Sequence, residues 1–119
     1  MTIIKAQDIV DTVAGALQYI SYYHPADYIA HLARAYEREQ SVAAKDAMAQ
    51  ILTNSRMSAE GHRPICQDTG IVNVFLKIGM DVRFEGCAEF GDGGIDDVIN
   101  EGVRRAYNHP DNKIGRAHV

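Results

Sequence analysis

A short polar stretch at residues 63–70 brings together four side chains that can do chemistry. It reads Arg-Pro-Ile-Cys-Gln-Asp-Thr-Gly, so a thiol, an amide, a carboxylate and a hydroxyl follow one another at Cys66, Gln67, Asp68 and Thr69. The proline near its start fixes one backbone angle, and the glycine at its end permits angles closed to other residues. Both favour an ordered loop, and ordered loops on rigid scaffolds commonly carry functional sites. We therefore predict a functional site in this loop.

The thiol of Cys66 allows three interpretations. On residue statistics alone a cysteine is a small buried hydrophobe, but the neighbours of this one are polar and no periodic apolar run surrounds it. It could be a nucleophile activated by His62, although four residues of loop give no assurance that the two side chains meet. It could also bind a metal, and its fellow ligands would then lie elsewhere, because the chain has no CxxC or HExxH pattern.

Other side chains give weaker signals. His62 itself is expected to be solvated rather than to orient the loop. His24 and His31 lie in helical surroundings without a partner at metal spacing, so we expect structural roles for both. Cys87 has no partner ligands nearby, so we expect a surface or packing thiol. The glycines at 91–94 could bind an anion through backbone N–H groups, but one glycine cluster is weak evidence, and we expect a flexible connection.

The composition is that of a single soluble globular domain. The 119 residues are 46% hydrophobic and 24% charged. The formal net charge of −4, without a basic stripe, gives no reason to expect nucleic acid or an anionic membrane surface as a partner. No apolar run approaches the ~18 residues of a membrane span, and the amino terminus lacks a signal-peptide pattern. We therefore expect a cytoplasmic protein, in which a disulfide between Cys66 and Cys87 is disfavoured.

Helices are predicted before the loop. Apolar residues recur at helical spacing over residues 5–22. A second helix should begin at Pro25, and Ser41 can cap a third that ends at Gly61. The short links between them favour antiparallel neighbours and hence a small helical layer.

The period of the apolar residues changes after the loop. Over residues 72–78 apolar and other side chains alternate, which predicts a strand. Residues 79–81 predict a turn into a second strand at 82–84, so the two strands should form a β-hairpin that needs further partners. A last helix is predicted over 95–107, with acidic residues at its start and arginines near its end. The predicted fold class is α+β: about three helices, the cysteine loop, a β-hairpin and a further helix, as part of a larger domain.

Several segments resemble a known enzyme family. Residues 51–56 (Ile-Leu-Thr-Asn-Ser-Arg) and 61–70, with the core Pro-x-Cys-Gln-Asp-Thr-Gly, resemble the amino-terminal part of the class I, iron–sulfur-dependent fumarate hydratases. That family also includes the alpha subunit of L-tartrate dehydratase. The resemblance extends from residues 20–25 to Asn112 and Lys113, which is nearly the whole chain.

The resemblance implies a reaction and a role for three residues. In such enzymes three widely separated cysteines hold a 4Fe-4S cluster whose open iron binds the substrate, and Cys66 matches the first of these cysteines. Gln67 is implied to contact the substrate, and Asp68 to bind it and to act in acid–base catalysis. The implied reaction is the reversible hydration of fumarate to (S)-malate, with the open iron as Lewis acid. The implied partners are a small dicarboxylate and, at full length, a second copy in a homodimer, with neither nucleic acid nor a membrane.

The resemblance covers only part of such an enzyme. We expect residues 1–113 to be the amino-terminal part of the catalytic domain, without the other two cluster cysteines and the proton-abstracting base, and hence inactive alone. Residues 114–119 match what a sequencing adapter encodes, so we expect a non-native tail in place of the family's Leu-Arg pair. Two alternatives stay open: the alpha subunit of L-tartrate dehydratase, which pairs with a separate beta subunit, and a non-catalytic structural or assembly module.

Overall fold

The structure, a computed structural model, describes residues 1–66 and 70–109. The chain divides into unit 1, Met1–Gln18 with Asp68–Val119, and unit 2, Tyr19–Gln67. Helices and a small sheet are both present, so the predicted α+β class is confirmed.

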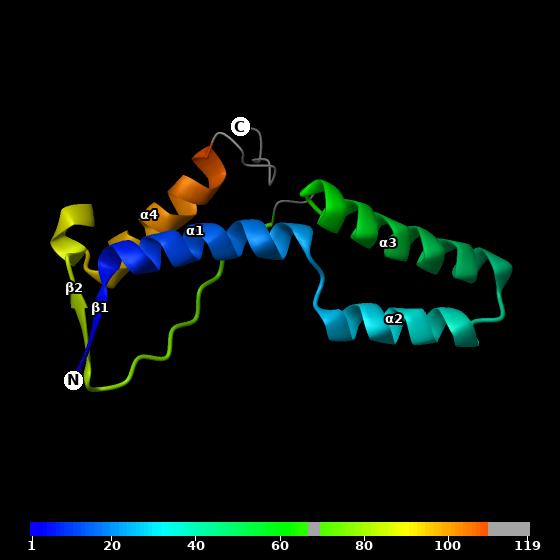
Figure 1. Ribbon diagram of the computed structural model, residues 1–119, viewed down its shortest axis with the longest axis horizontal. Coiled ribbons are helices and arrows are strands. Elements are labelled where there is room, and N and C mark those ends of the chain that lie inside the picture. The colour runs from blue at the N-terminus through cyan, green and yellow to red at the C-terminus, as the bar shows by residue number, and fades with distance from the viewer. Residues whose placement is uncertain (67–69, 110–119) are drawn as a thin grey trace. The chain divides into compact units, whose positions relative to one another are not determined.

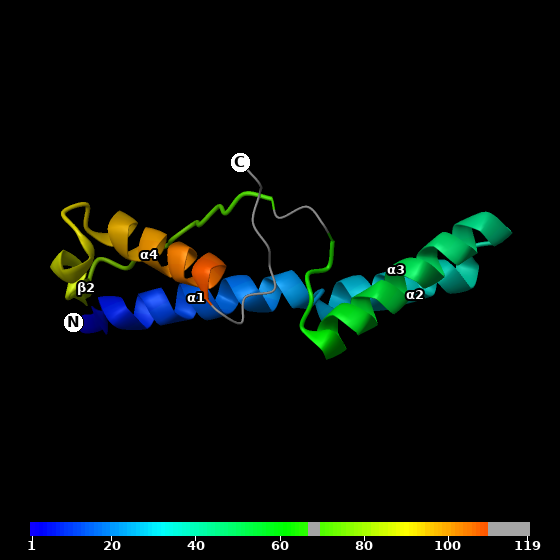
Figure 2. The same cartoon turned by 90° about the horizontal axis from the view of Figure 1, so that it is seen from above.

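Unit 2 is built from two paired helices, α2 (Ala26–Arg38) and α3 (Val42–Gly61). The two lie side by side, joined by a short connection, as predicted for antiparallel neighbours (Figures 1 and 2). Pro25 directly precedes α2, where a helix start was predicted. Ser41 caps α3 as predicted, because its Oγ accepts a hydrogen bond from the N–H of Ala44 at 3.4 Å.

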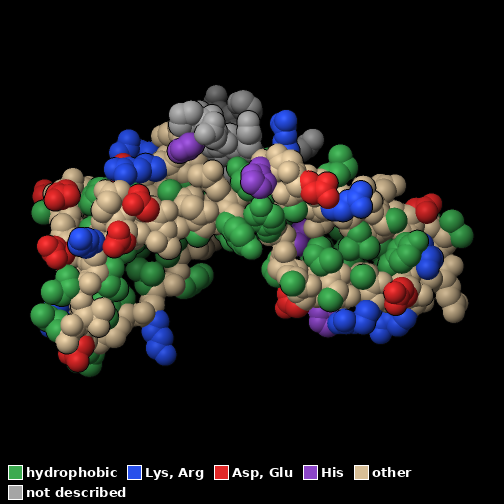
Figure 3. Space-filling model, in the orientation of Figure 1, with side chains coloured by type: hydrophobic (Ala, Val, Ile, Leu, Met, Phe, Trp, Pro, Cys, Tyr) green, Lys and Arg blue, Asp and Glu red, His purple; other side chains and the backbone are tan. Residues whose placement is uncertain are grey.

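The apolar side chains between α2 and α3 are only partly buried. Figure 3 shows hydrophobic side chains along the line where these helices meet, with Lys and Arg side chains on the outer side of α2. No residue of α2 is buried, and the buried residues of α3 are the polar Ser55 and Ser58. The contact between α2 and α3 therefore fully buries no apolar side chain of either helix.

Unit 1 contains the sheet. β1 (Thr2–Lys5) pairs in parallel with β2 (Val82–Glu85), beside which it lies in Figure 1. The helix α1 (Ala6–Tyr22), whose first part belongs to this unit, follows β1 directly. The short helix η1 (Cys87–Phe90) and α4 (Ile95–Asn108) follow β2. The helices predicted at the two ends of the chain are therefore confirmed as α1 and α4.

The core of unit 1 lies between α1 and α4. Ala6, Val10 and Val98 are buried there. Partly buried side chains pack against them: Ile9, Cys87, Phe90 and Ile95. Cys87 is therefore a packing thiol, which is one of the two roles predicted for it.

The predicted β-hairpin is wrong. Residues 72–78 form neither helix nor strand, and the strand predicted at 82–84 pairs with β1 at the amino terminus. Alternation shows that a segment suits a sheet, but it does not name the partner strand. β1 gives little signal because it has four residues and runs straight into a helix. Large side chains of the stretch before β2 stay exposed, with Phe75 at 93% and Met80 at 94%.

Two further expectations concern the chain as a whole. The non-native tail predicted at residues 114–119 lies outside the described residues. Of the helices described, none is both long enough and apolar enough to cross a membrane.

Candidate functional site

Cys66 lies in the loop that follows α3, and its side chain is exposed. This exposure argues against the interpretation of Cys66 as a buried packing residue. Gln67 and Asp68, the other two residues predicted for the site, lie outside the described residues. The structure therefore describes the first part of the loop, residues 62–66, and the contacts that fix its position.

The loop begins with a residue in an unfavourable backbone conformation. His62 ends α3 with φ 49° and ψ 55°, in the left-handed region, and its N–H donates to the carbonyl oxygen of Ser58. The N–H of Arg63 donates to the same oxygen at 3.1 Å. His62 is the one non-glycine residue with positive φ in the described part of the chain. Such a conformation costs roughly 1–2 kcal/mol, so surrounding contacts must hold His62 in place.

Two tyrosines supply those contacts. The ring of His62 stacks on Tyr22 with centroids 5.5 Å apart and planes at 2°. Nε2 of His62 is hydrogen-bonded to the hydroxyl of Tyr23 at 2.9 Å. The expectation of a merely solvated His62 is therefore wrong, because this exposed ring orients the start of the loop. Its Nε2 is hydrogen-bonded to the hydroxyl of Tyr23 and not to the thiol of Cys66.

The residue before the cysteine is held from two sides. The N–H of Ile65 donates to the carbonyl oxygen of Ser21 at 2.9 Å. The side-chain amide of Asn54 donates through Nδ2 to the carbonyl oxygen of Ile65 at 2.7 Å. Sequence reasoning did not identify Ser21 or Asn54, although both lie in segments that carry the resemblance. The loop is therefore attached both to the end of α1 and to α3.

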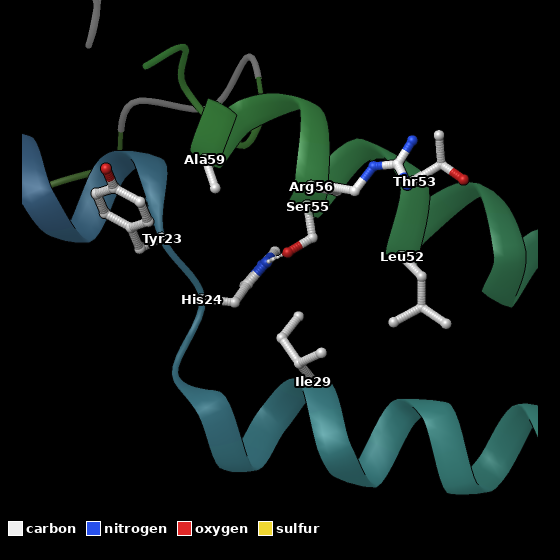
Figure 4. A pocket seen from close by; sticks show the side chains of 8 residues that line it. All are labelled: Tyr23, His24, Ile29, Leu52, Thr53, Ser55, Arg56 and Ala59. Atoms are coloured by element: carbon white, nitrogen blue, oxygen red, sulfur yellow. Dashed lines mark hydrogen bonds between the residues drawn. The ribbon is translucent and has the colours of Figure 1, made fainter. Parts of the chain in front are cut away.

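A cavity of about 540 Å³ lies beside the same attachment (Figure 4). It is lined by Tyr23, His24, Ile29, Leu52, Thr53, Ser55, Arg56 and Ala59. Nδ1 of His24 is hydrogen-bonded to Oγ of the buried Ser55 at 2.9 Å, and the imidazole stacks on Tyr28 at 4.6 Å. His24 is therefore structural, as predicted, and it ties the connection between α1 and α2 to α3. Nδ1 of His31 is hydrogen-bonded to the guanidinium of Arg34 at 2.8 Å, so His31 is likewise structural.

The described residues do not assemble a metal site by themselves. Residues 1–66 and 70–109 contain no group of three or more His, Cys, Asp or Glu side chains placed to hold a metal ion. Iron–sulfur clusters are held by cysteine thiolates. An exposed thiol on a held loop fits the contribution of one such ligand, so Cys66 fits part of a cluster site that the described residues do not complete.

The glycine cluster before α4 holds one of the chain's own carboxylates. The N–H of Gly93 donates to Oδ2 of Asp97 at 2.6 Å. A Cβ at Gly93 would lie 2.9 Å from atoms of this carboxylate. The position that an external anion would need is therefore taken by Asp97.

Comparison with known proteins places the chain in a family. The family model of fumarate hydratase (Fumerase) matches residues 10–117. A protein of Methanocaldococcus jannaschii named "Putative L(+)-tartrate dehydratase subunit alpha" is 34% identical over 98 residues, which are 82% of this chain and 33% of that protein. The chain thus spans about a third of the length of the curated relative it matches. No solved structure matches it. Because the family match encloses α2, α3 and the loop of Cys66, the chain belongs to the fumarate hydratase family.

Proposed function

We propose that the chain supplies one wall of the active site of a hydro-lyase that reversibly adds water to fumarate, giving (S)-malate. The observation that carries the proposal is that the family match at 10–117 encloses an exposed thiol, Cys66, on a loop held by hydrogen bonds. A held loop keeps a donor atom in one place, which metal ligation and substrate positioning both need.

The proposed chemistry gives each residue of the loop a distinct task. Cys66 would provide one thiolate ligand to a 4Fe-4S cluster, with the remaining ligands coming from residues beyond this chain. When bound, such a cluster supplies a Lewis-acidic iron that polarises the hydroxyl group to be removed. The amide of Gln67 would donate a hydrogen bond to a substrate carboxylate. Asp68 would bind the substrate and pass a proton to the departing hydroxyl, which then leaves as water.

A second candidate is the dehydration of L-tartrate, with the chain as part of an alpha subunit that pairs with a beta subunit. The name of the Methanocaldococcus jannaschii relative supports it. Both reactions remove water from a hydroxylated dicarboxylate, so the same loop residues would serve either. The proposed partners differ: a homodimer for the fumarate hydratase, and a separate beta subunit for the tartrate enzyme.

The test uses the longer gene product that contains this chain, reconstituted anaerobically with iron and sulfide. We expect Cys66→Ala to lose bound iron, fumarate hydration and any L-tartrate dehydration. Cys87→Ala is the matched control, because Cys87 packs on the core of unit 1 and should leave iron content and activity unchanged. A Cys66→Ala protein that keeps its iron and activity would overturn the proposal. Tartrate dehydration that requires an added beta subunit would favour the second candidate, and iron binding without either activity would favour a non-catalytic module.

The role of Asp68 is tested separately from cluster binding. We expect Asp68→Asn to keep its iron and to lower kcat by a factor of about 10²–10⁴, the usual contribution of a proton donor or acceptor. Its pH–rate profile should also lose one limb. Unchanged rates and an unchanged profile would remove Asp68 from the mechanism. The 119-residue chain alone is expected to be inactive in both assays.

A further inference from the structure

We infer that Asn54 is a positioning residue for Cys66: its side-chain amide fixes the peptide plane that joins residues 65 and 66 and so sets where the thiol is presented. This inference rests on the proposed role of Cys66 as a ligand. The hydrogen bond from Asn54 to the carbonyl oxygen of Ile65 lies within unit 2 and exists without iron, sulfide or substrate.

The geometry of one peptide unit carries the inference. The side-chain amide of Asn54 donates a hydrogen bond to the carbonyl oxygen of Ile65 at 2.7 Å. This oxygen lies in the same rigid peptide plane as the nitrogen and Cα of Cys66. The N–H of Ile65 is bound on its other side to the carbonyl oxygen of Ser21 at 2.9 Å. With both polar backbone atoms engaged, the backbone at Ile65 cannot rotate without losing a hydrogen bond. Fixing this plane therefore fixes the Cα from which the thiol projects.

The donor comes from a rigid element. Asn54 lies within α3, next to Ser55, which is buried and hydrogen-bonded to His24 at 2.9 Å. The Asn54 side chain is itself exposed, so it contributes little to the packing of α3. An amide suits this position because it can donate. A carboxylate of the same shape has no donor and would face the carbonyl oxygen of Ile65.

A matched pair of substitutions separates this contact from a general effect on the helix. Asn54→Asp and Gln50→Glu each turn an amide into a carboxylate on α3. Gln50 lies one turn earlier, is exposed, and makes no side-chain hydrogen bond within the described residues. Only Asn54→Asp removes a bond to the loop. Asn54→Ala, which adds no charge, should act in the same direction as Asn54→Asp.

Amide hydrogen exchange in the 119-residue chain reports how often the backbone at Ile65 opens when the Asn54 bond is missing. We expect exchange of the Ile65 N–H to accelerate by roughly five- to tenfold in Asn54→Asp and to stay unchanged in Gln50→Glu. Exchange of the α3 amides should be equal in the two variants. Equal acceleration throughout α3 would make Asn54 a structural residue of the helix and overturn the inference.

The position of the thiol is measured with a nitroxide label on Cys66. The second label goes on α2 through Glu37→Cys, in a Cys87→Ser background, so that both labels lie in unit 2. We expect double electron–electron resonance to give a narrow distance distribution for the parent and for Gln50→Glu, and a broader one for Asn54→Asp. Equal widths in all three would refute the inference. Because no iron is involved, a broadened distribution together with a cluster that survives Cys66→Ala would uphold the positioning and overturn the proposed function alone.

Discussion

Replacing Gly102 by alanine should destabilise unit 1, although alanine is the better helix former. Gly102 is buried in α4 where this helix crosses α1. A Cβ there would lie 2.7 Å from Cβ and 2.9 Å from Cγ1 of Val13, and 3.0 Å from the carbonyl oxygen of Val10. One of these atoms belongs to the backbone of α1, so a rotamer change of Val13 cannot relieve the overlap. The two helices would have to move apart.

Two opposing terms set the magnitude. Inside a helix, replacing glycine by alanine stabilises the folded state by about 1 kcal/mol through helix propensity. Overpacking a close contact costs roughly 1–3 kcal/mol, and the upper part of that range applies because of the backbone contact. The unfolding free energy of unit 1 should therefore fall by about 1–2 kcal/mol.

Gly15→Ala in α1 is the matched control. A Cβ at Gly15 would meet nothing within 4 Å, so only the helix-propensity gain acts and stability should rise by about 0.5–1 kcal/mol. Urea denaturation followed through the amide signals of α4 reports unit 1 by itself. A separation of the two variants by about 1.5–3 kcal/mol is expected. If Gly102→Ala proved as stable as Gly15→Ala, the α1–α4 crossing described above would be wrong.

Three further predictions concern a cap, a charge cluster and the start of the loop. Ser41→Ala should destabilise α3 by about 0.5–1 kcal/mol, with faster exchange of the Ala44 amide; unchanged exchange would refute the cap. Hydrogen bonds from two arginines of α4, Arg104 first and Arg105 second, hold the pKa of Glu101 below its usual value. A lowered folded-state pKa gives stability that is present above the unfolded-state pKa and lost as the pH falls through the folded-state value. Urea midpoints should thus drop on acidification, and Glu101→Gln should remove part of that drop; identical pH curves would contradict it. Tyr23→Phe should lose about 0.5–1 kcal/mol through the missing bond to His62, seen as faster exchange of the Arg63 amide, whereas Tyr19→Phe should change nothing there.

The helices were predictable because their signals are local. The cap at Ser41 and the turns near Pro25 and Gly61 depend on residues within one helical turn. The apolar periodicity of α1 and α4 is likewise contained in the segment itself. Strand pairing is not local, and so the same reasoning failed for β2, whose partner lies about eighty positions earlier at Thr2–Lys5.

The sequence drew attention to Cys66 but not to the contacts that hold its loop. Cys66 stands out because a thiol among polar neighbours is unusual in a loop. Asn54 does not stand out, because an exposed asparagine in a helix gives no sign of where its amide will donate. The left-handed conformation of His62 was equally hidden, since glycine is the residue normally expected after a helix.

The hydrogen bonds of the loop connect the segments on which the family resemblance rests. Ser21 and Tyr23, from residues 20–25, bind Ile65 and His62, and Asn54, from residues 51–56, binds Ile65 as well. Each bond needs a particular atom from two of these segments. These hydrogen bonds therefore link the three segments to one another and hold the backbone from which the exposed thiol of Cys66 projects.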